Sequence, residues 1–363
     1  MDRWKLNRCV CVWLCWLLPL AAQAQSAFTG VVVVGDSLSD SGNGAAARDF
    51  ISGDTTPFPP YSNGLCNPVD VLPLGPGCDT LFFQMSRVTD GPVAVEHLAE
   101  ALGLAADSEP SFYLLPPEIP VPISGLNYAV ASAKARAPGV EDLASQVGAL
   151  LLDHGGTLPP QALYVVIIGG NDVVDAVQAL ASSSESPRDI IRSAVDSIVA
   201  NVELLIDSGA RYVLVANVPN VGALPAVREL LEGDSPLERL AGRIATFAAR
   251  TFNVHLWWRL RGAQFRHPSA QIQVFDLFGV LERELALARF WGRNFTDACF
   301  RSDIYFDSPI GERVFHPDCA PEVGGTPRFD RFVFWDVLHP TGRVHVAIGE
   351  ALLQAASEFS IEQ

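Results

Sequence analysis

Four short apolar runs stand out along the chain, and longer segments with helical periodicity lie between them. The runs cover residues 30–34, 163–168, 212–216 and 271–275. They read as continuous rather than alternating in polarity, which is typical of parallel strands that are buried on both faces. We therefore predict four parallel strands.

The segment between the second and third runs predicts a helix. Ser186 is placed to cap it, Pro187 to occupy its first position and Gly209 to end it. Its apolar residues recur at spacings of four and three: Ile191, Val195, Ile198, Val202 and Leu205. Two more helices are expected over residues 237–260 and 341–357.

This alternation of strands and helices predicts an α/β fold, a doubly wound sandwich with a mostly parallel sheet and right-handed crossovers. In such folds the reactive groups gather at the carboxyl ends of the strands. Ser37, Asn171 and Asn217 directly follow three of the predicted strands. These three residues are therefore candidates for a functional site.

Residues 1–24 are predicted to be a signal peptide and not part of the fold. A basic start is followed by an apolar stretch over residues 9–21 and by a small-residue cleavage site, Ala22-Gln23-Ala24. The apolar stretch is short for a membrane span, and no later run is long enough for one. We expect an exported protein, secreted or periplasmic, with no transmembrane segment after cleavage.

Residues 25–363 are expected to form one domain, because no linker, internal repeat or low-complexity tract interrupts them. Cleavage removes one aspartate and three basic residues, so the formal charge changes from −16 to −18. Such a negative chain is not expected to bind nucleic acid or an anionic surface. A monomer is expected.

Four cysteines remain after cleavage: Cys66, Cys78, Cys299 and Cys319. An even number in an exported chain indicates two disulfides, for which three pairings are open. We favour the two local pairs, Cys66–Cys78 and Cys299–Cys319, because each brackets a loop rich in proline and glycine. Free buried thiols are the alternative, and the lack of a CxxC spacing disfavours a zinc site.

Two segments at opposite ends of the chain indicate a Ser-His-Asp site. Ser37 follows the first apolar run, and Asp336 stands three residues before His339. A serine hydroxyl needs a neighbouring base to act as a nucleophile, and the base needs an acid that orients it. The alternative role for His339 is structural, as a cap of the helix that begins near Thr341.

The second predicted strand ends in Gly169-Gly170-Asn171-Asp172, which can serve a developing oxyanion. Asn171 would donate its side-chain amide, and Asp172 would brace it or cap the next segment. The alternative is that these residues form an ordinary turn.

Together these residues resemble three blocks of the GDSL, or SGNH, hydrolase family. The blocks are Gly35-Asp36-Ser37-Leu38-Ser39-Asp40 with Gly42-Asn43, Gly169-x-Asn171-Asp172, and Asp336-x-x-His339-Pro340-Thr341. Their order matches the family's, and the likeness to its larger bacterial and plant-type lipase/esterase members spans almost the whole mature chain. The resemblance implies a three-layer α/β/α, flavodoxin-like fold and ester hydrolysis without a metal or an organic cofactor.

By this resemblance Ser37 is the nucleophile, His339 the base and Asp336 its orienting acid. The oxyanion would be held by the Ser37 amide, by Asn171 and by a backbone amide of a further block, residues 125–133.

That block carries Ala131-Ser132 where relatives carry glycines. Register favours Ser132 as the donor, with Ala131 as the alternative. A backbone amide tolerates the change where φ stays negative, and the added Cβ narrows the acyl site. Thr89-Asp90-Gly91 is a second departure, from the Ser-Asn-Gly of many relatives.

We expect an exported serine ester hydrolase that cleaves carboxylic or lipid-like esters. A phospholipase or lipid acyltransferase and a carbohydrate acetylesterase are the alternatives among enzymes, and an inactive binding module is the alternative outside them. No G-x-S-x-G segment occurs, which disfavours the α/β-hydrolase class. The aromatic pairs Phe82-Phe83, Trp257-Trp258 and Phe290-Trp291 are expected in the core or along an acyl groove.

Overall fold

The computed structural model describes residues 28–52, 87–118, 125–182, 185–229, 238–300, 315–320 and 327–361. The signal peptide predicted for residues 1–24, the pair Cys66–Cys78 and the pair Phe82-Phe83 lie outside these residues.

A parallel sheet of four strands forms the centre of the fold, as the apolar runs predict. Its strands are β1 (Val31–Gly35), β2 (Leu163–Ile167), β3 (Tyr212–Ala216) and β4 (Gln271–Phe275). They pair in the order β1-β2-β3-β4, all parallel. The first three strands are buried along their whole length, and β4 is only partly covered. The bounds differ from the predicted ones by at most one residue at each end.

A fifth segment, residues 126–130, extends the sheet beyond β1. The Tyr128 N–H donates to the Val33 carbonyl (2.8 Å), and the Val33 N–H donates to the Leu126 carbonyl (3.0 Å). The Val130 N–H continues this ladder to the Gly35 carbonyl (3.1 Å). The segment therefore ends beside the end of β1, where Ser37 follows.

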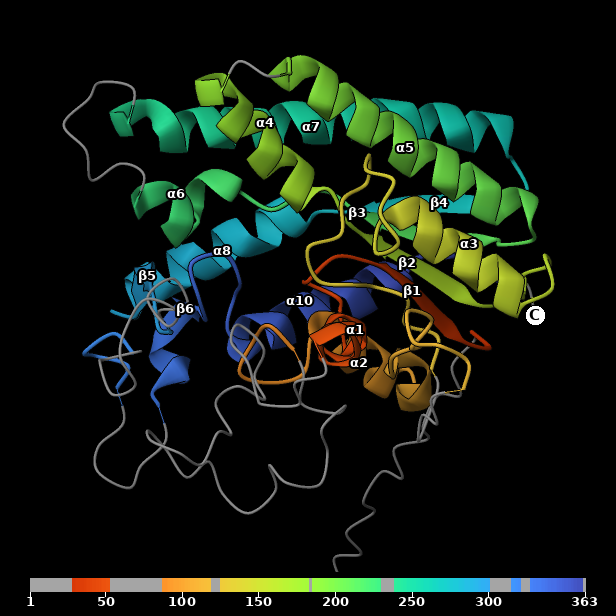
Figure 1. Ribbon diagram of the computed structural model, residues 1–363, viewed down its shortest axis with the longest axis horizontal. Helices are drawn as coiled ribbons and strands as arrows, with labels where there is room; N and C mark the ends of the chain where they lie inside the picture. Colours follow the sequence, from red (N-terminus) through yellow and green to blue (C-terminus); the bar gives the residue numbers. More distant parts are fainter. Residues whose placement is uncertain are drawn as a thin grey trace, which may run out of the picture.

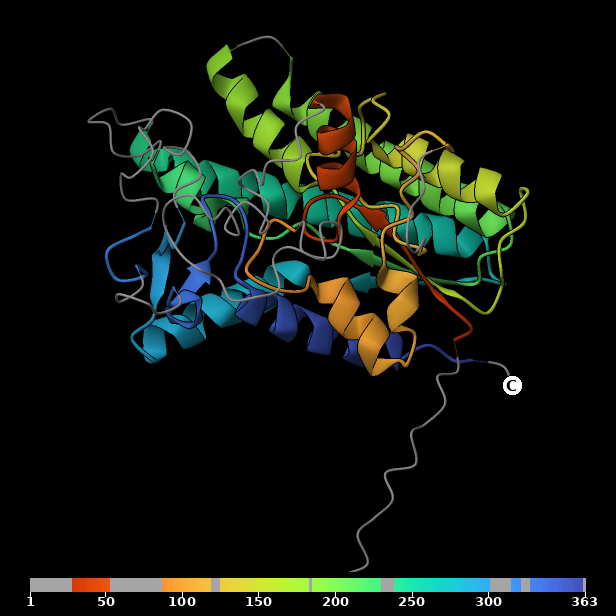
Figure 2. The same ribbon diagram turned by 60° about the horizontal axis from the view of Figure 1, so that its bottom comes forward.

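Helices cover both faces of the sheet, which gives the three expected layers (Figures 1 and 2). One layer contains α3 (Leu143–Asp153), α4 (Gly170–Ser182), α5 (Pro187–Asp207) and α7 (Glu238–Arg266). The other contains α2 (Ala94–Ala101), α8 (Leu277–Phe290) and α10 (Gly342–Ala356). Helices α1 (Asn43–Ser52) and α6 (Pro225–Glu229) follow loops on the side of the sheet where β1 and β3 end.

Helix α5 follows the predicted pattern, with one correction. Pro187 is its first residue, and Gly209 follows its end with φ +123°, a conformation that favours glycine. Ser186 occupies the N-cap position, but its side chain makes no capping hydrogen bond. The Ser186 backbone carbonyl instead accepts the N–H of Asp189, the third helical residue, at 2.9 Å.

The other two predicted helices also form. Helix α7 runs to Arg266, six residues beyond the predicted end, because Gly262 does not interrupt it and Pro268 is the first strong stop. Helix α10 begins at Gly342, with Thr341 as its N-cap residue. Its position matters because it directly follows the loop that carries His339.

Candidate active site

Ser37, His339 and Asp336 lie in one hydrogen-bonded line. The His339 Nε2 atom lies 2.9 Å from Ser37 Oγ, across 302 residues of sequence. The His339 Nδ1 atom lies 2.9 Å from both carboxylate oxygens of Asp336. All three residues are buried, with at most 9% of their surface exposed. The His339 ring therefore joins the serine to the carboxylate and does not cap α10.

The loop between strand β6 (Phe332–Phe334) and α10 fixes the histidine. Asp336 Oδ1 accepts the backbone N–H groups of Leu338 (2.8 Å) and His339 (2.7 Å). The His339 carbonyl accepts the Trp335 N–H at 2.8 Å, which closes the turn. The carboxylate thus holds both the ring and the backbone of His339.

Thr89 and Asp90, which belong to the segment that departs from the Ser-Asn-Gly of many relatives, also hold the loop that carries His339. Thr89 Oγ1 donates to the Pro340 carbonyl (3.0 Å), and Asp90 Oδ1 accepts the Gly342 N–H (2.6 Å). Asp90 is therefore placed at the N-terminus of α10, where a carboxylate is favourable.

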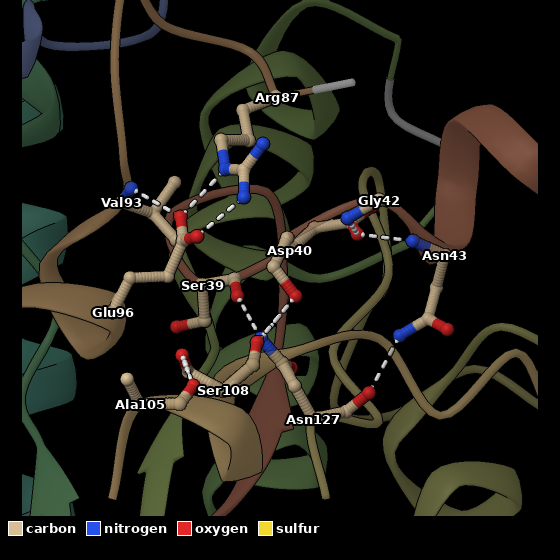
Figure 3. Close-up of polar contacts among 11 residues, drawn as sticks. Ser39, Asp40, Gly42, Asn43, Arg87, Val93, Glu96, Ala105, Ser108 and Asn127 are labelled. Carbon is tan, nitrogen blue, oxygen red and sulfur yellow. Dashed lines mark hydrogen bonds and ion pairs between the residues drawn. The ribbon is translucent and has the colours of Figure 1, made fainter. Parts of the chain in front are cut away.

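A buried polar network holds the loop that carries Ser37 (Figure 3). Asp40 Oδ1 accepts the N–H groups of Gly42 and Asn43 at 2.7 Å each, and its Oδ2 accepts those of Gly44 (3.0 Å) and Ala131 (2.8 Å). The Asp40 carboxylate therefore starts helix α1 and also anchors the end of segment 126–130.

Two buried asparagines complete this network (Figure 3). The Asn127 side chain donates to the Ser39 carbonyl (2.7 Å), and the Asn43 side chain donates to the Asn127 carbonyl (2.7 Å). Each bond links the Ser37 loop to the edge segment beside it. Since both amides are buried, loss of either bond would leave unpaired polar groups in the interior.

Ser132 occupies a turn for which glycine is better suited. The Ala133 N–H donates to the Val130 carbonyl (3.2 Å), so Ser132 is the third residue of a β-turn, and its φ is +69°. The condition of a negative φ, under which the backbone amide was expected to tolerate the change, is therefore not met. The turn requires this conformation, which glycine adopts without strain.

The backbone amides of Ser37 and Ser132 have no acceptor among the described residues. The Ala131 N–H, the alternative to Ser132, is instead bound by Asp40. Ser132 is exposed, whereas Ser37 is buried. Of the two candidates in the altered block, only Ser132 keeps its amide free for a ligand.

Asn171 lies at the start of α4, not in an ordinary turn. Its side-chain amide donates to the Ala133 carbonyl at 2.9 Å, which leaves a second N–H on the same nitrogen. Gly169, which links β2 to α4, has φ +113°, and a Cβ there would lie 2.6 Å from the Phe252 ring. Glycine is therefore required where the chain turns to present Asn171.

Asp172 does not brace Asn171 directly. Its carboxylate accepts the N–H groups of Ala135 (2.8 Å) and Arg136 (3.3 Å), and the Arg136 guanidinium lies 3.6 Å away. The residue thus connects α4 to the loop after Ser132. It therefore links the residues that follow β2 to those that follow segment 126–130, on the two sides of β1.

The electrostatic environment raises the pKa of His339. Burial lowers the pKa of His339, but the charge and hydrogen bond of Asp336, together with the charge of Asp36, outweigh it, so the pKa is raised above its usual value of 6.5. Burial raises the pKa of Asp36 to about 7, although the hydrogen bond from the Leu38 N–H and the charge of His339 both lower it. Asp36 is the acidic neighbour that the sequence analysis did not single out for a role.

A mostly apolar pocket adjoins Ser37. Its polar lining is formed by Asp36, Ser37, Asn171 and His339. The remaining lining is largely apolar and includes Val174, Val221, Leu224, Leu277, Leu281, Phe334, Leu338 and Ile348. Ser132 is not among the lining residues. The pocket thus places apolar side chains directly beside the serine hydroxyl.

The two aromatic pairs that fall among the described residues lie on the surface, not in the core or an acyl groove. Trp257, Trp258, Phe290 and Trp291 are all exposed, and none lines the pocket beside Ser37. Two adjacent aromatic residues on a helix point in directions about 100° apart, so both cannot face the same side. The adjacency of two aromatic residues in the sequence therefore does not predict that both lie in the core or in an acyl groove.

Asn217 follows β3 as predicted but belongs to another contact. Its side chain donates to Asp276 Oδ1 and accepts the Phe278 N–H, both at 2.8 Å. These bonds connect the end of β3 to the start of α8. Asn217 is not among the residues that line the pocket beside Ser37.

Cys299 and Cys319 form a disulfide, with their Cα atoms 5.4 Å apart. Both are buried in a small apolar cluster with Phe300, Phe332 and Trp335. The bridge therefore lies next to the loop that begins at Trp335 and carries Asp336 and His339.

Within the described part of the chain, no group of three histidine, cysteine, aspartate or glutamate side chains is arranged to hold a metal ion. Among the same residues, no helix is both long and apolar enough to span a membrane.

Comparison with known proteins identifies the family. The GDSL-like Lipase/Acylhydrolase family matches residues 31–352. Among curated proteins, the chain is 22% identical to the GDSL esterase/lipase At4g18970 of Arabidopsis thaliana, over 90% of this chain and 88% of that protein. It is 22% identical to the phosphatidylcholine-sterol acyltransferase of Aeromonas hydrophila, over 91% and 90%.

A third relative, the GDSL esterase/lipase At3g50400 of Arabidopsis thaliana, is 25% identical over 55% of this chain. In that comparison the chain spans about half of the relative, 52% of its length. The family match itself includes all three blocks that carry Ser37, Asn171 and His339. The chain belongs to the GDSL-like lipase/acylhydrolase family.

Proposed function

We propose that this chain is a serine ester hydrolase that forms an acyl-enzyme on Ser37. The observation that carries the proposal is the 2.9 Å contact between Ser37 Oγ and His339 Nε2, with Asp336 on the other ring nitrogen. This is the arrangement that general-base activation of a serine requires.

The reaction proceeds in two halves. Ser37 Oγ attacks the ester carbonyl carbon while its proton passes to His339 Nε2, and the resulting tetrahedral intermediate breaks its bond to the alkoxide. His339 returns the proton to that leaving alcohol. A water molecule then repeats the sequence on the acyl-enzyme, which releases the acid and restores Ser37.

Three donors are assigned to the oxyanion: the Ser37 N–H, the Ser132 N–H and the Asn171 side chain. The first two have no protein acceptor among the described residues, and the third keeps one N–H unused. Asn171 also lies in the first turn of α4, where the helix dipole favours a negative charge.

The apolar pocket beside Ser37 is assigned to the acyl part of the substrate. Its lining favours carboxylic esters with an apolar acyl group, including lipid-like esters. A lipid acyltransferase is the second candidate, because a relative that the chain matches over most of its length is named a phosphatidylcholine-sterol acyltransferase. An alcohol would then replace water in the second half of the reaction.

Export is part of the proposal. The leader over residues 1–24 has the charge pattern and cleavage site of a signal peptide, and a disulfide joins Cys299 and Cys319. Disulfides persist in oxidising compartments. We therefore assign the mature chain, residues 25–363, to the periplasm or the cell exterior, as one domain and as a monomer.

Covalent labelling tests the catalytic assignment. The mature protein is treated with a fluorophosphonate, and the labelled peptide is identified by mass spectrometry. Labelling on Ser37, absent from Ser37→Ala, supports the proposal, and turnover of an ester panel should vanish with it. An unlabelled, folded protein would instead be a binding module, and a Ser37→Ala protein that keeps its turnover would overturn the role of Ser37.

A further inference from the structure

The outward side of helix α7 carries a line of exposed apolar residues. Its inward side is buried and contains Ala245, Ala249, Phe252, Leu256, Leu260 and Ala263. The residues of the outward line, here called the α7 stripe, are Leu240, Phe247, Val254, Trp258 and Phe265. Each has between 45% and 88% of its surface exposed.

The spacing of the α7 stripe places its residues on one side of the helix. Successive members are seven, seven, four and seven residues apart, and both intervals return to nearly the same face. Surface helices of soluble domains usually present polar residues outward. A continuous apolar line, unlike a single exposed leucine, marks a surface that contacts another apolar phase.

An apolar groove of about 600 Å³ adjoins the stripe. Helices α4, α5 and α7 form it, and Phe247 belongs to both the stripe and the groove. Its apolar lining includes Val177, Leu180, Ile191 and Ile244, and Arg188 and Arg192 contribute cationic side chains. The apolar surface is therefore wider than one helix and includes a recess for a chain-like group.

Arginines flank the stripe along one edge. Between Leu240 and Arg266, helix α7 contains five arginines and no acidic residue, in a chain whose formal charge is −16. Arg259 and Arg266 pair with acidic residues of α5, on the far side of the stripe.

The other three arginines, Arg243, Arg250 and Arg261, have no carboxylate partner among the described residues. Arg261 lies over the Trp257 ring (5.6 Å), and Arg250 lies over the Phe278 ring (5.5 Å). Their charges therefore remain available to an anionic partner.

We propose that the α7 stripe docks on the surface of an anionic lipid bilayer. Helices that lie in the plane of a membrane interface typically carry tryptophan and phenylalanine beside arginine. The α7 stripe has this composition. The apolar side chains would enter the boundary of the acyl chains, and the arginines would meet lipid phosphates. The negative charge elsewhere on the chain acts weakly there, because screening limits its reach to about 8 Å at physiological ionic strength.

Charge favours lipid over a second copy of this chain. In a two-fold dimer built on the stripe, the arginine-flanked surface of one copy would face the same surface of the other. Such a contact would bring Arg243, Arg250 and Arg261 of both copies together, and none of these three has a carboxylate partner among the described residues. The lipid surface offers the opposite charge.

Vesicle sedimentation tests this inference with the mature chain. We expect binding to vesicles of phosphatidylcholine mixed with phosphatidylglycerol. Trp258→Ser combined with Phe265→Ser should weaken binding about 100-fold, because each side chain loses roughly a tenfold contribution from burial. Arg243→Gln combined with Arg261→Gln should weaken it about 10- to 30-fold on these vesicles and leave binding to pure phosphatidylcholine unchanged.

Phe290→Ser combined with Trp291→Ser is the matched control, since this exposed aromatic pair lies at the end of α8. It should bind like wild type, as should Ser37→Ala, which separates docking from catalysis. Thermal unfolding confirms that each variant is folded. Absence of wild-type binding, equal binding by the stripe variants, or a wild-type dimer that these variants dissociate would each overturn the proposal.

Discussion

The Asp40 carboxylate lies 2.8 Å from the Ala131 backbone nitrogen and accepts its N–H, although 91 residues separate them. The same carboxylate accepts the N–H groups at the start of α1, directly after the Ser37 loop. One buried side chain thus holds two of the proposed oxyanion donors, the amides of Ser37 and Ser132, in fixed relation. Asp40 is a positioning residue in this scheme, since it touches neither the substrate nor the reacting atoms.

Asp40→Asn is expected to lower kcat by up to about 100-fold, with little change in KM. An amide accepts through one oxygen only, so part of the clamp opens and the donors shift from the oxyanion. Steady-state kinetics on a soluble ester measures this. Asp107→Asn is the matched control, because Asp107 accepts the Val31 N–H at the opposite end of β1. An unchanged kcat in folded Asp40→Asn would remove the positioning role.

Ser132→Gly is expected to raise the free energy of unfolding by about 1 kcal/mol and to preserve kcat. The gain arises because glycine adopts the observed φ of +69° without the clash of a Cβ. Denaturant unfolding and ester turnover measure the two effects. Ser132→Ala keeps the Cβ and removes only the hydroxyl, so both quantities should match wild type.

Ser132→Pro is expected to abolish most activity, because proline removes the N–H and cannot adopt a positive φ. If Ser132→Gly loses activity at unchanged stability, the Ser132 hydroxyl takes part in the reaction directly, in addition to the backbone N–H.

The acid limb of the pH–rate profile is expected above pH 6.5. His339 must be neutral to accept the Ser37 proton, and its pKa is raised above 6.5, so activity falls as the pH drops through this raised value. Asp336→Asn removes the main cause of the rise and should move the limb to lower pH, while kcat falls by roughly 10,000-fold. A profile of kcat/KM against pH measures both, and a wild-type limb below pH 6.5 would contradict the assignment.

Asn171→Ala is expected to lower kcat by about 100- to 1000-fold with little change in KM, because the side-chain amide donates mainly to the charge of the transition state. Asn217→Ala is the matched control. Asn217 also follows a strand, but its amide is bound to Asp276. Equal losses in the two variants would indicate a structural effect and not a lost oxyanion donor.

Val174→Phe is expected to reduce turnover of long-chain esters by at least tenfold relative to acetate esters, since a larger side chain on α4 fills the pocket beside Ser37. A change of one or a few methylene groups in an apolar pocket typically alters kcat/KM by 10- to 200-fold. Val177→Phe, on the same helix but in the groove next to α7, should leave the chain-length preference unchanged. A matching shift in both variants would reject the pocket as the acyl site.

The sequence by itself determined the sheet and the three residues of the proposed Ser-His-Asp site. Strands β1, β2 and β3 lie between two helical layers, so each must be apolar along its length. Each strand can therefore be recognised in the sequence as a continuous apolar run. The bounds of α5 could be predicted because they depend on local backbone preferences: Pro187 favours the first helical position, and Gly209 adopts the positive φ that follows the helix end. Ser37, Asp336 and His339 were readable because chemistry fixes their type and the family blocks fix their order.

Only the tertiary structure decided the rest, because those features depend on what lies across space. Segment 126–130 pairs with β1 through backbone groups, which leave no mark on side-chain pattern. The role of Asp40 depends on an amide 91 residues away, and the φ of Ser132 depends on the turn that joins two packed segments. Helix α7 has apolar residues on two sides, and periodicity does not say which side the protein covers. Burial is a property of the assembled layers, so the fold alone shows that Trp258 and Phe265 face outward.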